Sequence, residues 1–472
     1  MSKNKLISFF IALERGEYRW FRDFISSPYF NKNEEVNKLG NVYLDLASRG
    51  FPDHSSSSET VFATAFPEST YDEKRMTYLS SDLLQLGEQF LAQRSYEADG
   101  VTTELYRLDA CRKRKLEKSY RTNLRKVKKQ LAKDQRESLP VLYQKFFFTQ
   151  IQQRHFADQG ERTASPFLQR TVEELDHFYF ASKLRLSNVM LSTELTLNHS
   201  YDFRFVEPST LGQVTELPEH GLADLYANCF ALLKTTNRED LLLSFLSEIR
   251  SNVQQLVPED VQELFYHGIN YCIRQIRIGH RNFADSLLSL YQAGLEDGFL
   301  IEADGYISPW NYKNIIKLGL SLRKFDWVES IIATYTDSLA PESRSDARHF
   351  NLADLAYHRR DFPEAQYHLQ QTEFTDIHYA LGAKSMLIKI YYATDAEDAL
   401  LALLFSFRLF LVRNQLIGQA TKDAYLNFIR LVKKLAGTDD LVKLQKVHQS
   451  VSTTASLSDR SWLLKEVNKK MK

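Results

Sequence analysis

Apolar residues recur at three- and four-residue intervals along nearly the whole chain, and no stretch shows the sustained alternation that is typical of a β-strand. The chain has 472 residues but only 17 Gly and 11 Pro, so tight turns are few for its length. Apolar residues make up 43% and charged residues 25% of the sequence, which argues against wholesale disorder, a collagen-like fibre and a membrane-embedded protein. We therefore expect an all-α protein. Pro-Glu pairs at Pro67, Pro258 and Pro341 are expected to mark helix starts, because proline at the first helical position loses no hydrogen bond.

An internal repeat occupies the second half of the chain. Its unit is Asp or Asn, then an apolar residue, then a small residue four positions after the Asp or Asn. Five ordered copies begin at Asp240, Asn282, Asp326, Asp361 and Asp395, at intervals of 42, 44, 35 and 34 residues. Repeats of this length are typical of stacked helix pairs. We expect the Asp or Asn to cap the second helix of each pair, and a small residue such as Ala365 or Ala399 to let the two helices approach closely.

Residues 349–372 resemble a tetratricopeptide repeat. Leu352-Ala353 match the middle of its first helix, and Phe362, Ala365 and Leu369 match its second helix. The resemblance implies a tetratricopeptide-like α-solenoid of helix pairs in residues 211–472, preceded by a helical N-terminal region.

The match departs from the family pattern at two positions and weakens in the neighbouring copies. His349 stands where the family has tryptophan, and Arg360 stands where it has the glycine before the second helix. Weaker copies span residues 312–336 and 384–408.

Three further segments resemble an uncharacterised bacterial family of helical-repeat proteins, a likeness that implies no activity. They are Ser26–Leu39 (SSPYFNKNEEVNKL), Phe405–Phe410 (FSFRLF) and Tyr425–Leu435 (YLNFIRLVKKL).

The tetratricopeptide resemblance also implies a concave groove lined by the first helix of each pair. Carried over by register, the groove positions are Tyr312, Arg323, Phe350, Asp354, Tyr357, His358, Lys384, Ile388, Tyr391 and Tyr392. Aromatic side chains with charges of both signs suit a peptide better than a small polar metabolite. The alternative is that the tyrosines pack between adjacent repeats.

Breaks in the helical pattern suggest three regions. The pattern is interrupted at Asp99-Gly100 and again through residues 201–218. We expect an N-terminal helical region over 1–98, a middle region of long helices over 99–210, and the repeats over 211–472.

The strongest charge feature is residues 107–136, which hold thirteen Lys and Arg against three Asp and Glu. The spacing predicts one long helix with an apolar stripe on one side and a cationic face on the other. The cationic face comprises Arg114, Lys118, Arg121, Arg125 and Lys128. Such a face can bind nucleic-acid phosphates, bind an acidic surface, or remain a solvated helix face. No helix-turn-helix, zinc-finger or RNA-recognition signature accompanies it.

Catalytic signatures are missing from the sequence: there is no phosphate-binding loop, dinucleotide fingerprint, nucleophile elbow or zinc-protease motif. Glu174 and His177 form one E-x-x-H fragment, but a di-iron bundle needs a second copy that the chain does not have. We expect no metal, no cofactor and no enzymatic activity.

Several features bear on the compartment. The formal charge balances at 60 Lys and Arg against 60 Asp and Glu, so the whole chain gives no electrostatic reason to favour nucleic acid or a membrane. Three separated cysteines fit a reducing compartment. The apolar run Leu6–Leu13 is short and is followed directly by Glu14-Arg15, so we expect an amphipathic helix rather than a signal peptide. A cytoplasmic location is expected.

Together these features favour a non-catalytic scaffold or adaptor that binds a segment of a partner protein in a helical groove. The alternative is a nucleic-acid-associated protein that uses the basic segment 107–136.

Overall fold

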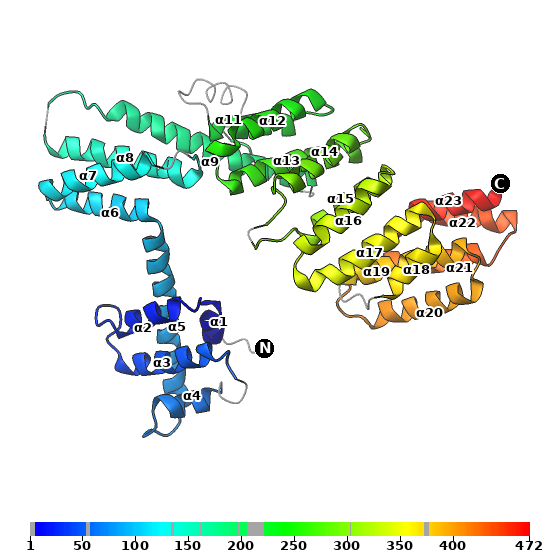
Figure 1. The fold of residues 1–472 in the computed structure, drawn as a ribbon, viewed down its shortest axis with the longest axis horizontal. Coiled ribbons are helices and arrows are strands. Elements are labelled where there is room, and N and C mark those ends of the chain that lie inside the picture. The colour runs from blue at the N-terminus through cyan, green and yellow to red at the C-terminus, as the bar shows by residue number, and fades with distance from the viewer. Residues whose placement is uncertain are drawn as a thin grey trace. The chain divides into compact units, whose positions relative to one another are not determined.

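The computed structural model describes residues 5–52, 57–133, 136–160, 162–196, 199–204, 221–302, 304–371 and 377–472. Within these ranges the chain forms 22 α-helices and no β-strand, which confirms the all-α prediction (Figure 1). No helix among the described residues is both long enough and apolar enough to cross a membrane. The chain divides into two compact units, residues 1–182 and 183–472. The division expected near residue 98 falls between two helices, and the one expected near residue 210 lies outside the described residues.

Nine helices belong to the first unit, the last of which continues into the second. They are α1 (Lys5–Ala12), α2 (Glu17–Ser26), α3 (Glu34–Ser48), α4 (Ser58–Ala65), α5 (Glu73–Ala98), α6 (Gly100–Lys113), α7 (Glu117–Leu131), α8 (Leu139–Asp158) and α9 (Leu168–Thr196). The apolar run near the N-terminus forms α1, which buries Leu6, Phe9 and Phe10 among α2, α3 and α5. Side chains of Asn33 and Asp72 cap α3 and α5 by accepting backbone N–H bonds, the role for which short polar residues are favoured.

The basic segment is two helices rather than the single long helix that the spacing predicted. α6 ends at Lys113, and Lys115 adopts a left-handed conformation with φ of 56°. The Leu116 N–H then donates to the Cys111 carbonyl, which closes the turn before α7 begins. Leu116 itself is half exposed, so it does not continue the apolar stripe. Glycine is the residue that usually reveals such a turn, and here lysine occupies the position.

Thirteen more helices make up the second unit. They are α11 (Leu222–Leu233), α12 (Glu239–Asn252), α13 (Pro258–Arg277), α14 (Phe283–Glu296), α15 (Pro309–Ser321), α16 (Phe325–Tyr335), α17 (Pro341–Arg359), α18 (Phe362–Gln370), α19 (Ile377–Ala393), α20 (Glu397–Arg413), α21 (Gln419–Ala436), α22 (Leu441–Thr453) and α23 (Arg460–Met471). Pro258 and Pro341 begin α13 and α17 as predicted. The prediction was wrong at Pro67, which lies in a turn directly after α4, where the Ser69 N–H donates to the Phe66 carbonyl.

Successive helices of the second unit pack as pairs, but the repeated residues act as predicted in only one pair. In α17–α18, the Asp361 side chain caps α18, and Ala365 is fully buried. Asp240 and Asp326 instead lie inside their helices, and Asp395 precedes the capping position of α20.

The small residues of three other copies were also misassigned. Ala399, Ser330 and Ser244 are exposed, so they do not bring helices together. Glycines do this instead: a Cβ on Gly319 would lie 2.5 Å from Val328 Cγ2, closer than side chains approach. A Cβ on Gly382 would likewise meet the Phe350 ring, at 2.8 Å.

Candidate binding groove

An open groove of about 1870 Å³ lies within the second unit. Its lining residues come from α15, α17 and α19 with the turns that follow them, from the first turns of α16, α18 and α20, and from α21 and α23. These helices are coloured yellow to red in Figure 1. The groove thus draws on three successive helix pairs and on the C-terminal helix.

Seven of the ten groove positions implied by the register line this groove. They are Arg323, Phe350, Asp354, Tyr357, His358, Tyr391 and Tyr392. The placement was wrong for Tyr312, which is fully buried with its hydroxyl 2.8 Å from Thr336 Oγ1, and for Ile388, which is also fully buried. It was wrong for Lys384 too, whose Nζ lies over the Phe410 ring at 5.2 Å, away from the groove.

Asp354 and His358 form a local ion pair on α17. The Asp354 Oδ1 lies 3.2 Å from His358 Nδ1, one helical turn away. Burial lowers the pKa of the His358 imidazole, but the hydrogen bond and charge of Asp354 outweigh that effect and raise the pKa above its usual value. The carboxylate of Asp354 is therefore already engaged by a neighbour.

The C-terminal hairpin supplies side chains that the sequence analysis missed. Asp459, just before α23, accepts bonds from Ser385 Oγ and Lys389 Nζ of α19, each at 2.5 Å. Trp462 meets the Tyr392 ring edge to face at 5.4 Å. Because the repeat ends before this hairpin, the repeat register could not place these residues in the groove. The only sequence signal for them is that two lysines, Lys465 and Lys469, lie one helical turn apart on α23.

Aromatic rings line the groove together with charges of both signs. The aromatic members are Phe325, Phe350, Tyr357, Phe362, Tyr391, Tyr392, Tyr425 and Trp462. Tyr357 is half-buried, and burial, reinforced by the charge of Glu466, raises the pKa of its phenol to about 12. The Tyr357 hydroxyl is therefore a neutral hydrogen-bonding group at physiological pH.

The second candidate surface is the α6–α7 hairpin of the first unit. Lys118, Arg121, Arg125 and Lys128 are exposed on α7, whereas Arg114 lies in the turn. Arg121 Nε is 2.7 Å from Glu117 Oε1, so part of the cationic face is neutralised.

Buried carboxylates of α6 neutralise further cations of this hairpin. Glu104 is 5% exposed and pairs with Arg107 and Lys126, and Asp109 is also 5% exposed and pairs with Arg112 and Lys113. Of these pairs, Lys126–Glu104 joins α7 to α6, and the other three lie within α6.

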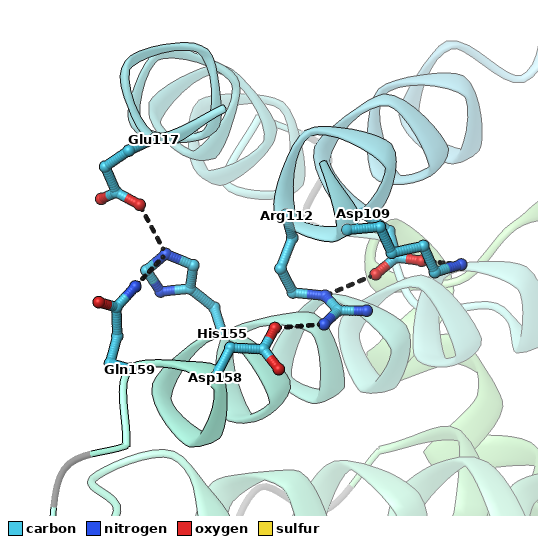
Figure 2. A network of polar contacts seen from close by, with 7 residues as sticks. Asp109, Arg112, Glu117, His155, Asp158 and Gln159 are labelled. Carbon is cyan, nitrogen blue, oxygen red and sulfur yellow. Dashed lines mark hydrogen bonds and ion pairs between the residues drawn. The ribbon is translucent and has the colours of Figure 1, made fainter. Parts of the chain in front are cut away.

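Figure 2 shows how the network joins the hairpin to α8. Arg112 lies between Asp109 and Asp158, with its Nε 2.8 Å from Asp109 Oδ1 and its Nη1 2.5 Å from Asp158 Oδ2. His155 Nε2 lies 3.0 Å from Glu117 Oε2. The bonds from His155 and Arg121 lower the pKa of Glu117, which keeps this carboxylate ionised.

Among the described residues, no group of three or more His, Cys, Asp or Glu side chains is placed so that it could hold a metal ion. The Glu174 carboxylate of the E-x-x-H fragment lies 3.4 Å from Arg170. Comparison with family models, with curated proteins and with solved structures found no match.

Proposed function

We propose that this protein is a non-catalytic scaffold or adaptor that binds a segment of a partner protein in the groove of the second unit. The helix pairs around the groove form, in this proposal, a tetratricopeptide-like solenoid. The observation that carries it is the groove itself, whose lining combines aromatic and charged side chains from three successive helix pairs. Aromatic side chains offer a large contact area with few rotors to immobilise, which suits peptide recognition.

A selection from a random-sequence peptide library on the full chain tests this proposal. The selected peptides should lose affinity for a chain with Tyr357→Ala and Tyr391→Ala, by about 1–2 kcal/mol for each ring that forms a hot spot. Tyr78→Ala is a matched control, because Tyr78 lies on α5 of the first unit and is 72% exposed. The control should bind as the unmodified chain does.

Two results would contradict the proposal. One is the failure to select any peptide, or equal binding of the peptides to both chains. The other is a loss of unfolding free energy of roughly 3 kcal/mol or more per tyrosine, which is the cost of a core cavity and would assign these rings to packing. Circular-dichroism melting of the same variant measures it.

Nucleic-acid binding by α7 is the second candidate. The observation that favours it is that Lys118, Arg125 and Lys128 are exposed and have no ion-pair partner among the described residues. Their spacing places them on neighbouring turns of one helix, where they can approach successive phosphates.

A further inference from the structure

One turn geometry recurs between paired helices of the second unit. After α15, α17 and α19, a single residue adopts a left-handed conformation: Arg323 with φ of 57°, Arg360 with φ of 65° and Asp395 with φ of 52°. In each case the next N–H donates to a carbonyl five residues earlier, as in a Schellman motif. Glycine is the usual residue at this position, because a side chain there costs free energy.

Arginine is an uncommon choice for a left-handed turn, and both arginines line the groove. Arg323 and Arg360 are exposed, and neither has an ion-pair partner among the described residues. A backbone outlier that presents a charged side chain at a candidate site suggests that the side chain has a use there.

The rest of the groove has a matching charge pattern. Nine Lys and Arg line it, against five Asp and Glu. Lys465 and Lys469 of α23 also line the groove; they are exposed and have no ion-pair partner in the described part of the chain. The carboxylates of Asp354 and Asp459 are held by His358 and Lys389. Among the described residues the groove then has five cations without an ion-pair partner (Lys317, Arg323, Arg360, Lys465 and Lys469) against three such carboxylates (Asp395, Glu397 and Glu466).

We propose that the groove takes an acidic protein segment, whose carboxylates pair with Arg323 and Arg360 of the turns and with Lys465 and Lys469 of α23. This inference rests on the proposed function and specifies the chemistry of the partner. These cations fix the direction and register of the segment, and the aromatic rings that line the groove contact its apolar side chains.

A protein segment fits this groove better than a nucleic acid does. A nucleic acid carries a charge at every nucleotide, and five carboxylates among the lining residues would repel a continuous row of phosphates. A peptide can place its acidic residues beside the cations alone. Trp462 and Tyr392 also contact each other edge to face, which leaves them less open to stacked bases.

The test uses fluorescence anisotropy with the full chain and three probes: a labelled peptide of glutamates with interspersed leucines, the same peptide with glutamine for glutamate, and single-stranded oligothymidylate. The glutamate peptide should bind best. Arg323→Gly with Arg360→Gly should weaken it roughly 5- to 30-fold, and Lys465→Gln with Lys469→Gln should weaken it similarly. Because glycine relieves the left-handed turns, the arginine variant should also melt at a higher temperature, so weaker binding cannot be due to unfolding.

Lys115→Gly is the matched control. It removes one cation from the same kind of left-handed turn, in the first unit and outside the groove. It should raise the melting temperature and leave peptide binding unchanged.

The inference is overturned if the glutamate peptide binds no more tightly than the glutamine peptide, or if oligothymidylate binds more tightly and loses affinity in the same variants. Failure of the proposed function looks different. In that case no library peptide depends on Tyr357 and Tyr391. Only the present inference fails if the selected peptides need the tyrosines, are not acidic, and bind the arginine variant as tightly as they bind the unmodified chain.

Discussion

The α6–α7 hairpin of the first unit and the groove hairpins of the second unit carry positive charge in different ways. In α6–α7, five cations pair with carboxylates of the same hairpin: Arg107, Arg112, Lys113, Arg121 and Lys126. In the groove, Lys317, Arg323, Arg360, Lys465 and Lys469 have no ion-pair partner among the described residues. Part of the charge excess of the basic segment therefore compensates carboxylates of its own helices, two of which are buried.

This difference makes opposite predictions for charge removal in the two units. A cation that compensates a buried carboxylate is needed for stability, whereas an exposed cation without a partner contributes little to folding. Net charge along a segment does not distinguish the two cases, because the compensating carboxylate can lie on another turn or another helix.

The largest effect is expected at Arg112. Arg112→Met leaves the buried Asp109 with Lys113 alone and removes the bond to Asp158, so the free energy of unfolding should fall by about 2–4 kcal/mol. Lys465→Met is the control and should change it by less than about 0.5 kcal/mol. Urea unfolding followed by circular dichroism measures both; equal effects would contradict the division into structural and available cations.

The next largest effect concerns the contrast between two neighbouring pairs, α17–α18 and α19–α20. Ala365 is fully buried, so Ala365→Leu should overpack the first pair and cost about 1–3 kcal/mol. The matching Ala399 is exposed, so Ala399→Leu should be within about 0.5 kcal/mol of neutral. A comparable loss of stability at both sites would mean that the repeat register holds in both pairs after all.

The sequence predicted the helical architecture well because helical spacing and pairing are local properties. It did not predict the break after Lys113, because Lys115 carries no signal for a left-handed turn and the apolar spacing continues across it. Close helix contacts at Gly319 and Gly382 were missed for a related reason: glycine within a helix is expected to weaken it, and only the packed partner shows its use.

The groove was predicted in part, and its errors have a physical pattern. Arg323, Tyr357 and Tyr391 line it as the register implied. Tyr312 is buried instead of lining the groove. Its hydroxyl has a buried hydrogen-bond partner in Thr336, which makes full burial of a tyrosine tolerable. The part of the groove that α23 lines depends on contacts between residues far apart in sequence. Lys389 and Asp459 are 70 positions apart, and helical periodicity does not encode such contacts.

A buried histidine of the second unit predicts a pH effect on stability. His267 on α13 is 5% exposed, and burial lowers its pKa, so the folded chain keeps it neutral. As the pH falls below the ordinary histidine pKa of about 6.5, the unfolded chain takes up a proton that the folded one resists, and stability should decrease. His267→Gln should flatten this decrease. Urea midpoints across this pH range test the difference.

The smallest effect is expected when the unpaired cations of α7 are removed. Lys118→Gln, Arg125→Gln and Lys128→Gln should leave the unfolding midpoint nearly unchanged, because glutamine keeps helix propensity and none of the three holds a carboxylate among the described residues. If these side chains bind phosphates, the same variant should weaken binding to duplex DNA and reduce the salt slope by roughly one unit for each phosphate that is no longer neutralised. Arg121→Gln is the control, since Glu117 already occupies its guanidinium. It should change the slope less than any of the three. If the unmodified chain shows no DNA binding even at low salt, α7 is a solvated helix face, and only the groove remains as a candidate binding surface.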